Sequence, residues 1–415
     1  MAIDDLAEPR FSPEVTAVMA AMTDAARRCP LEPDRLREAA VDSTGLEDFG
    51  DPAFGARLDV LCSSLALESG LSAMGTVSWY SQLVQFLANR LLVQDLLIRH
   101  PEIHEERIER PIIICGLPRT GTTHLHNLLS ADPALRHLPY WESLQPVLPD
   151  NERPGPGEPD PRRARTAQAL ELLDAAMPLF KRMHDMTVDH AHEEIQLLAI
   201  DLSSMLFETM APVPSWRDHY KASDQTPSYA YLRTVLKVLQ WLRGGTRWVL
   251  KSPQHLEQFR PLVAAFPDAT FVVTHRDPVA VTISVATMVT YTARLAVEQV
   301  DPVSFGRYWS DRTEDLVSAC GRDRHLLPAS RSIDVRFDDF MADDMGTVAR
   351  IYELAGQPLP DASRAAMAAF ARQHPRGRHG AVAYDPEALG IDPAERRAAL
   401  APYTERFKIA PDERW

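Results

Sequence analysis

The sequence has few cysteines, and those that it has are far apart. Its 415 residues include only Cys29, Cys62, Cys115 and Cys320, with no CxxC pair and no regular spacing. This scatter argues against a disulfide framework and against a zinc site. We therefore expect reduced cysteines that behave as small, buried hydrophobic residues.

The sequence also has fewer basic than acidic residues. The chain carries 44 Lys and Arg against 58 Asp and Glu, which gives a net charge of −14 at pH 7. Sequence-independent binding of nucleic acid requires a basic surface that displaces counterions, so we expect no nucleic-acid partner. An anionic ligand would instead need a local basic pocket. The candidates for such a pocket are Arg119, Lys251, Arg276, Arg376 and Arg378.

Long apolar runs and an export signal are absent as well. The longest apolar runs are interrupted well before the 18 residues that a membrane span needs, so we expect no integral membrane insertion. The first five residues are acidic where a secretory signal would be basic and then apolar. With 45% hydrophobic and 25% charged residues, the composition is that of a soluble enzyme, and we expect a cytoplasmic location.

Residues 1–108 have helical spacing and no strand pattern. We predict that they form a helical region that packs an amphipathic face on a second domain, residues 109–415, and caps an acceptor pocket. Trp79, Tyr80 and Phe86 are candidates to line that pocket, although aromatic residues at this spacing are more often core. The polar pair Asn89-Arg90 within an apolar helix predicts a buried ion pair.

Strand and helix patterns alternate after residue 110. Strands are predicted from Pro111 and at 247–250, 270–275 and 332–337, each followed by a helical pattern. This alternation predicts an α/β fold, a parallel sheet of the P-loop type with helices on both faces and ligands beyond the carboxyl ends of its strands. The proline-rich residues 149–163 predict an exposed loop that could act as a lid.

The first strand leads into the most informative stretch of the chain. Its β-branched residues stop at Gly116, and helical spacing resumes soon afterwards, which is the pattern of a strand, a phosphate-binding loop and a helix. The N–H groups of such a loop converge on an anion, and the helix adds its positive end. Gly116 and Gly121 have Walker A spacing, but Thr122 stands where the Walker lysine would be. The cation of this loop is Arg119.

This loop resembles the 5′-phosphosulfate loop of sulfotransferases that use 3′-phosphoadenylyl sulfate (PAPS), in which a basic residue, Ser or Thr, Gly and two Thr follow a Pro. The loop alone also fits a degenerate P-loop or an ordinary turn between a strand and a helix. The resemblance implies that six residues bind the phosphosulfate: Pro118, Arg119, Thr120, Gly121, Thr122 and Thr123.

Two later segments resemble the same family. Arg276 precedes Asp277-Pro278, and Ser284 follows it by eight residues, about two turns along a predicted helix. A guanidinium and a hydroxyl placed in this way can grip one phosphate, and the pair resembles the family's 3′-phosphate site. Lys251, in Lys251-Ser252-Pro253, resembles the lysine that faces the bridging oxygen of the leaving phosphate.

A weaker resemblance lies near the C-terminus. Arg376-Gly377-x-x-Gly380 is similar to the basic segment that closes over the nucleotide in this family, except that Pro375 stands at its first position. The resemblance implies that Arg376 and Gly377 contact the cofactor.

The resemblance implies a sulfotransferase that moves a sulfuryl group from PAPS, its co-substrate, to an acceptor hydroxyl and needs no metal. We expect an apolar small molecule or lipid as acceptor and adenosine 3′,5′-bisphosphate as product, with Arg119 and Lys251 stabilising charge on the leaving phosphate. Two alternatives stay open: a catalytically inactive nucleotide-binding P-loop protein, and a P-loop kinase, against which the missing Walker lysine counts. A homodimer also stays open.

The acceptor must lose a proton, and we predict Glu142 as the general base. It follows Arg119 by 23 residues, close to the place of the catalytic glutamate in tyrosylprotein sulfotransferases. The alternative is that Glu142 caps a helix or pairs with an arginine, in which case His124 or His192 takes the role. A further cluster has the composition of a metal site but is interpreted as solvated or supporting side chains: His190, His192, Glu193 and Glu194.

Overall fold

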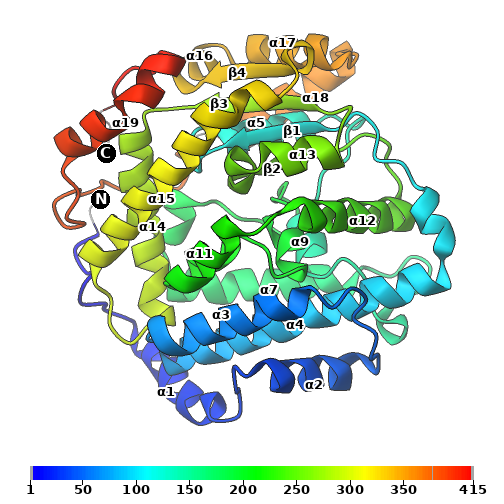
Figure 1. Cartoon of the computed structure of the whole chain (residues 1–415), viewed down its shortest axis with the longest axis vertical. Helices are drawn as coiled ribbons and strands as arrows, with labels where there is room; N and C mark the ends of the chain where they lie inside the picture. Colours follow the sequence, from blue (N-terminus) through cyan, green and yellow to red (C-terminus); the bar gives the residue numbers. More distant parts are fainter. Residues whose placement is uncertain (1–2, 376, 413–415) are drawn as a thin grey trace.

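A computed structural model describes residues 3–375 and 377–412, and its centre is one parallel sheet (Figure 1). The strand order is β2-β1-β3-β4, with every neighbouring pair parallel. A strand forms at each of the four predicted places: β1 (Ile112–Gly116), β2 (Val249–Ser252), β3 (Thr270–His275) and β4 (Ser332–Arg336). β2 begins and ends two residues later than the predicted 247–250, so Lys251 lies within the strand.

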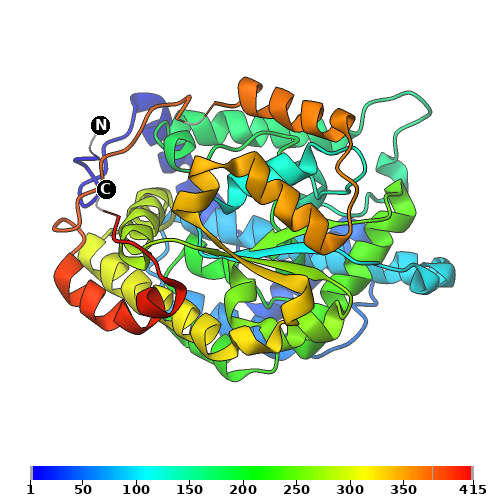
Figure 2. The same cartoon turned by 90° about the horizontal axis from the view of Figure 1, so that it is seen from above.

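Helices cover both faces of this sheet, as predicted (Figure 2). Side chains alternate along a strand between the two faces. One face is covered by α5 (Thr122–Ser130), α17 (Asp344–Ala355) and α18 (Asp361–Gln373), and Ile112 and Ile114 of β1 pack against them. Ile113 and Cys115 of β1 belong to the larger core on the other face. The larger core includes α9 (Ile195–Ile200), α12 (Thr226–Arg243), α13 (Phe259–Ala265), α14 (Pro278–Ala296) and α15 (Pro302–Asp323).

The edge strand β4 differs from the other three. It is half-exposed, whereas every residue of β1, β2 and β3 is buried. An edge strand has one neighbour instead of two, so charged side chains such as Asp334 and Arg336 can reach solvent from it.

Residues 3–108 are helical, as predicted, and contain no strand. The elements are α1 (Pro13–Ala26), α2 (Pro33–Thr44), α3 (Phe54–Glu68), α4 (Ala73–Arg99) and the short η1 (Pro101–Glu105). Their apolar side chains belong to the same core as the sheet. The predicted buried ion pair is also present, because Arg90 binds Asp201 at 2.8 Å. Asp201 ends α9 and separates it from α10 (Leu206–Met210).

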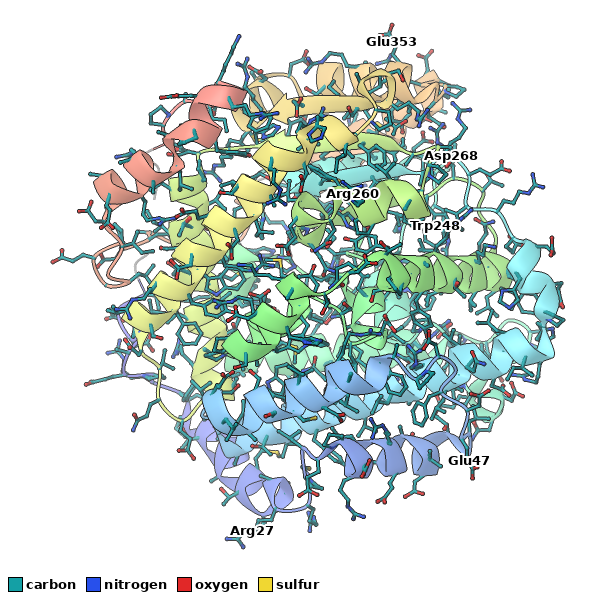
Figure 3. The ribbon with its side chains drawn as sticks, viewed as in Figure 1. Arg27, Glu47, Trp248, Arg260, Asp268 and Glu353 are labelled. Carbon is teal, nitrogen blue, oxygen red and sulfur yellow. The ribbon has the colours of Figure 1, made fainter. Side chains whose placement is uncertain are left out.

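The remaining elements connect these layers. They are α6 (Tyr140–Leu144), η2 (Asp150–Glu152), α7 (Pro161–Ala176), α8 (Phe180–Met183), α11 (Pro214–Ala222), η3 (Pro253–Glu257), η4 (Arg324–Leu326), η5 (Ala329–Arg331), α16 (Phe337–Ala342) and α19 (Pro393–Phe407). Figure 3 shows the contrast between the interior and the surface: Trp248 lies between the sheet and α12, whereas Arg27, Glu47 and Glu353 point outward.

Helix α14 qualifies the expectation that no segment is apolar enough to span a membrane. By length and composition it could cross one, but 78% of its most apolar 18-residue window is buried inside the protein. Its apolar character therefore has an explanation within the fold. It packs against α4, α10 and α15 and forms one wall of the main cavity.

Candidate active site

The loop between β1 and α5 is held in a tight turn against β3. A Cβ atom on Gly116 would lie 1.9 Å from the Thr274 hydroxyl, so only glycine fits there. Gly121 has a φ of 83°, which glycine adopts without strain, and it starts α5 at the carboxyl edge of the sheet. Thr120 fixes the loop through hydrogen bonds to the Leu117 carbonyl at 2.7 Å and to Thr274 at 2.8 Å. A rigid loop at a helix N-terminus suits a phosphate or sulfate group.

Arg119 crosses from this loop to α14. Its φ of 69° is unusual for a residue with a side chain and sets the direction of the guanidinium. The guanidinium donates to Ser284 at 3.1 Å and to the Tyr384 hydroxyl at 3.4 Å, and it also donates to the Met183 carbonyl. The structure thus joins Arg119 and Ser284, two predicted site residues that lie in separate motifs.

Arg276 lies on the other side of the loop backbone. Its guanidinium donates to the Arg119 carbonyl at 2.7 Å and holds the carboxylate of Asp412 at 2.8 Å. It also stacks over the Phe337 ring at 4.3 Å. Arg276 and Ser284 are therefore linked through Arg119, and Asp412 occupies the place that an anion would take at Arg276.

Lys251 binds two adjacent glutamates. Its backbone N–H donates to Glu194 at 2.8 Å, and its ammonium donates to Glu193. Glu194 is fully buried and also binds His255 at 2.6 Å, which fastens this segment to the end of β2. Lys251 itself is buried and lines neither of the two cavities near the loop, but Glu193 does line one of them.

Glu142, the predicted base, is not brought to the loop. Its carboxylate is fully buried between Arg136, at 2.8 Å, and Arg243, at 3.4 Å, and it lines neither cavity. Arg136 pairs with the backbone of Arg247 and Val249 at the start of β2. The chain after α5 therefore returns to the amino end of this strand and fixes Glu142 there, whereas a ligand of the loop would lie at the carboxyl ends. The alternative that Glu142 pairs with arginine describes what the structure has.

The remaining predicted residues are placed as follows. Thr123 lines both cavities, and Pro118, Thr122 and Arg276 line the main one. Gly377 lies at the second cavity, of about 510 Å³, which is lined by basic and histidine side chains. Arg376 lies outside the described residues. The predicted loop 149–163 contains η2 and, from Pro161, the start of α7 with the buried Arg162. It lines neither cavity, so nothing in its position supports a lid.

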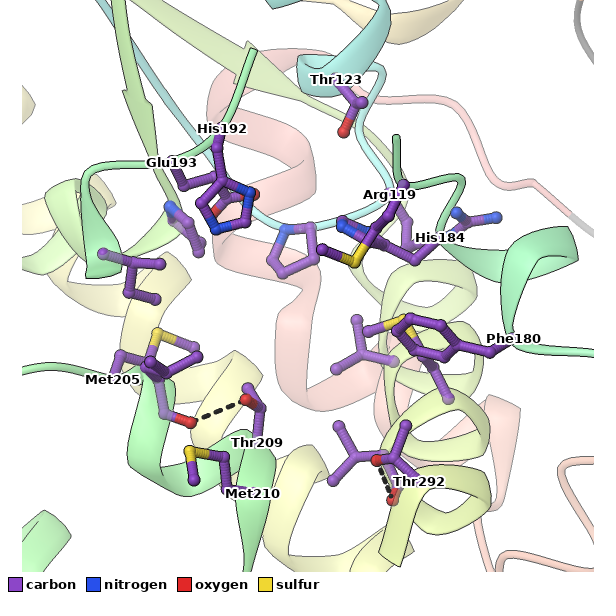
Figure 4. Close-up of a pocket in the computed structure, with 18 of the residues that line it drawn as sticks. Arg119, Thr123, Phe180, His184, His192, Glu193, Met205, Thr209, Met210 and Thr292 are labelled. Carbon is purple, nitrogen blue, oxygen red and sulfur yellow. Dashed lines mark hydrogen bonds between the residues drawn. The ribbon is translucent and has the colours of Figure 1, made fainter. Parts of the chain in front are cut away.

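The main cavity, of about 660 Å³, has a polar roof and an apolar floor (Figure 4). The roof holds Arg119 and Thr123 from the loop region, with His192 and Glu193 on one side and His184 on the other. The floor lies between α4, α10 and α14, where the hydroxyls of Thr209 and Thr292 bond to their own helices. Many floor and wall residues are flexible and apolar: Met74, Met177, Met186, Met205, Met210 and Met288.

Only one of the three aromatic residues suggested for an acceptor pocket lines this cavity. Trp79 does so from α4. Phe86 packs on Phe207 with ring centres 6.0 Å apart, and Tyr80 packs against the core. Phe86 is on the same face of α4 as Trp79 but about two turns farther along, past Gln82, which is the last residue of α4 on the cavity. Tyr80 directly follows Trp79 and therefore lies about 100° around the helix from it.

Histidines around the roof stay neutral. Burial lowers the pKa of His184 to about 3 and that of His190 to about 4. Burial and the neighbouring His190 and His184 also hold the pKa of His192 well below its usual range. His124 instead lies 3.1 Å from Asp344 and against the Phe340 ring.

Comparison with known proteins explains this arrangement of motifs. Residues 111–361, more than half of the chain, match the model of the sulfotransferase family. The chain belongs to this family. The matched segment begins at β1 and includes the loop, Lys251, Arg276 and Ser284, so the motifs that resemble sulfotransferases lie within it.

Solved sulfotransferase structures extend the similarity to nearly the whole chain. Sulfotransferase STF1 from Mycobacterium tuberculosis H37Rv is 31% identical, with a TM-score of 0.78, over 89% of this chain and 98% of that one. Sulfotransferase STF9 from Mycobacterium avium is 27% identical, with a TM-score of 0.80, over 91% and 97%. The N-terminal helices are therefore part of a shared architecture.

A curated relative is named for its acceptor. Omega-hydroxy-beta-dihydromenaquinone-9 sulfotransferase Stf3 from Mycobacterium bovis is 24% identical over 260 residues. The match covers 59% of this chain and 62% of that relative, which is less than two thirds of its length.

Two carboxylates that the sequence analysis does not single out bind predicted site residues. Glu193 had been grouped with its neighbours as a solvated or supporting side chain, but it binds Lys251 at the edge of the main cavity. Asp412 near the C-terminus binds Arg276. The sequence signal for Glu193 is an acidic pair directly before the apolar run of α9, where Glu194 is fully buried and Glu193 lines the main cavity. Asp412 offers no comparable signal.

Proposed function

We propose that this protein transfers the sulfuryl group of PAPS to the hydroxyl of an apolar alcohol, such as a lipid, and releases adenosine 3′,5′-bisphosphate. The observation that carries the proposal is the continuity of the main cavity. Its roof is an anion-binding loop with an arginine, and its floor is apolar. A donor phosphosulfate at the roof and a long apolar acceptor below it would meet at one point.

The residues at the roof fit an anionic donor. Gly116 and Gly121 allow the loop to turn tightly against β3 and α16, and Arg119, Arg276 and Thr123, which line the main cavity, are all hydrogen-bond donors. In an in-line sulfuryl transfer, positioning and charge stabilisation supply most of the catalysis. Arg119 and the loop N–H groups would stabilise the charge that develops on the leaving phosphate, and Lys251 would add its charge from behind Glu193.

Arg276 and Ser284 are proposed to hold the 3′-phosphate. Both now bind protein groups, Arg276 through Asp412 and Ser284 through Arg119. A phosphate carries more charge than a carboxylate and accepts more hydrogen bonds, so it would displace Asp412 from the guanidinium.

The floor of the cavity supports an apolar, chain-like acceptor. Methionine side chains adapt to the shape of a flexible ligand. The name of the curated relative, which specifies a hydroxylated menaquinone, is in line with this choice.

The test is a transfer assay with PAPS and primary alcohols of increasing chain length, read out as bisphosphate formation. Rates should rise with chain length until the floor is filled. Thr292→Trp would fill the floor, and it should slow transfer to long alcohols while leaving the affinity for adenosine 3′,5′-bisphosphate unchanged. Transfer from ATP in preference to PAPS would support the alternative of a P-loop kinase. Binding of the bisphosphate without any transfer would support the alternative of an inactive nucleotide-binding protein.

A further inference from the structure

We propose that Glu193 is the general base that takes the proton of the acceptor hydroxyl. This inference rests on the proposed function and gives Glu193 the role that the sequence analysis predicts for Glu142. Among the described residues that line the main cavity, Glu193 is the one with a carboxylate.

The position of Glu193 is set by its neighbours in the chain and across the sheet. Glu194, directly after it, accepts the Lys251 N–H at 2.8 Å and binds buried His255 at 2.6 Å. These bonds hold the backbone at the carboxyl end of β2, which is the edge where the loop also lies. Glu193 then has little freedom except in its own side chain, and that side chain lies on the cavity opposite Arg119 (Figure 4).

One oxygen of Glu193 is engaged and the other is available. Oε1 accepts from the Lys251 ammonium, and Oε2 has no hydrogen-bond partner within residues 3–375 and 377–412. The side chain is 18% exposed, against 0% for that of Glu142. A carboxylate with one fixed oxygen and one open oxygen is oriented to accept a proton from a hydroxyl within hydrogen-bond distance.

The histidines on the same cavity fit this role less well. Burial lowers the pKa of His184 to about 3 and holds that of His192 well below its usual range, so a proton from the acceptor would create a buried positive charge on either ring, whereas a protonated carboxylate is neutral. His124 lines both cavities, but its Nε2 lies 3.1 Å from Asp344 of α17 and its ring packs on Phe340 of α16, whereas the apolar floor lies between α4, α10 and α14.

In the sulfuryl-transfer step, the acceptor O–H bond breaks and its proton goes to Glu193, while the acceptor oxygen forms a bond to sulfur. The bond between sulfur and the bridging phosphate oxygen breaks, and its electron pair stays on that oxygen, where Arg119 and the loop N–H groups stabilise it. The proton is released to solvent after the sulfate ester and the bisphosphate leave.

Glu193→Gln tests this role, because glutamine can still accept from Lys251 but cannot act as a base. With a long primary alcohol, kcat should fall by about 10² to 10⁴. With an acidic alkyl phenol, which needs little help to lose its proton, the loss should be within about tenfold. The acid limb of the rate profile against pH should disappear, and Glu193→Asp should restore part of the rate with the alcohol.

Two controls separate this inference from the proposed function. Calorimetry should give wild-type affinity of Glu193→Gln for adenosine 3′,5′-bisphosphate, and Glu142→Gln should retain turnover in its folded fraction. If the wild type is active and Glu193→Gln is within a few-fold of it for both acceptors, Glu193 is not the base although the proposed function stands. A wild type that does not bind the bisphosphate would overturn the proposed function itself.

Discussion

Two glutamates of this protein each bind a cation, and they differ in what else they can reach. Glu142 is closed in by Arg136 and Arg243, with no exposed surface on its side chain. Glu193 binds Lys251 at the edge of the main cavity and keeps one oxygen open. Both precede or begin helices near the sheet, and both look alike in the sequence.

The difference comes from the end of the sheet at which each glutamate is held. Arg136, the partner of Glu142, pairs with the backbone at the start of β2, whereas Lys251, the partner of Glu193, lies near the end of the same strand. Ligands of parallel α/β sheets bind at the carboxyl ends of the strands. An ion pair at the amino end therefore acts on stability, and a similar pair at the carboxyl end can act on a substrate.

The first prediction tests this contrast through the stability of Glu142→Gln. Replacing a fully buried carboxylate leaves Arg136 and Arg243 without their charge partner, and breaking a buried pair costs about 3 kcal/mol. Urea denaturation should show this loss of unfolding free energy, with little change in kcat per folded molecule. A variant of wild-type stability with a hundredfold lower kcat would reverse the roles of the two glutamates.

The second prediction extends the comparison to the ion pair between Arg276 and Asp412. Arg276→Gln should weaken binding of adenosine 3′,5′-bisphosphate by about 1.5 to 3 kcal/mol, because a charged hydrogen bond to the 3′-phosphate is lost. Binding of adenosine 5′-phosphate should hardly change. Calorimetry with both nucleotides measures the difference.

Asp412→Asn supplies a control of opposite sign. It removes the carboxylate that now sits on Arg276 at 2.8 Å, so the bisphosphate should bind more tightly. If Arg276→Gln weakened both nucleotides equally, Arg276 would serve the structure of the loop and would not recognise the 3′-phosphate.

These residues show which features of the protein can be predicted from its sequence. Local patterns predict the strands, the loop and the helix start at Asp277, because these features depend on neighbours in the chain. At that helix start, for example, Asp277 accepts from the Val279 N–H at 2.9 Å. Pairing between Lys251 and Glu193 joins residues 58 positions apart, and Asp412 reaches Arg276 across 136 positions. Such pairs depend on the path of the chain between them, which spacing alone does not specify.

Glu142 illustrates the limit most directly. A motif that counts residues from Arg119 can select a glutamate, but it cannot tell to which edge of the sheet the chain returns. That depends on the backbone pairing of Arg136 with Arg247 and Val249, which becomes visible only in three dimensions.

The last prediction concerns polar groups that are sealed from the cavity and should therefore act on stability alone. His126 on α5 is fully buried, and burial, together with nearby Lys251 and His137, holds its pKa well below the usual 6.5. Below pH 6.5 the unfolded chain binds a proton at this position and the folded protein does not, so the free energy of unfolding falls as the pH is lowered. One such group contributes at most about 1.4 kcal/mol per pH unit. His126→Leu should make the dependence of unfolding free energy on pH between 6.5 and 5 less steep by up to that amount, as measured by urea denaturation of the ligand-free protein. His104→Leu, a change at an exposed side chain, is the matched control and should leave the slope as in the wild type. An unchanged slope in His126→Leu would mean that His126 takes up a proton in the folded protein as readily as in the unfolded chain, and that burial at this position does not keep it neutral.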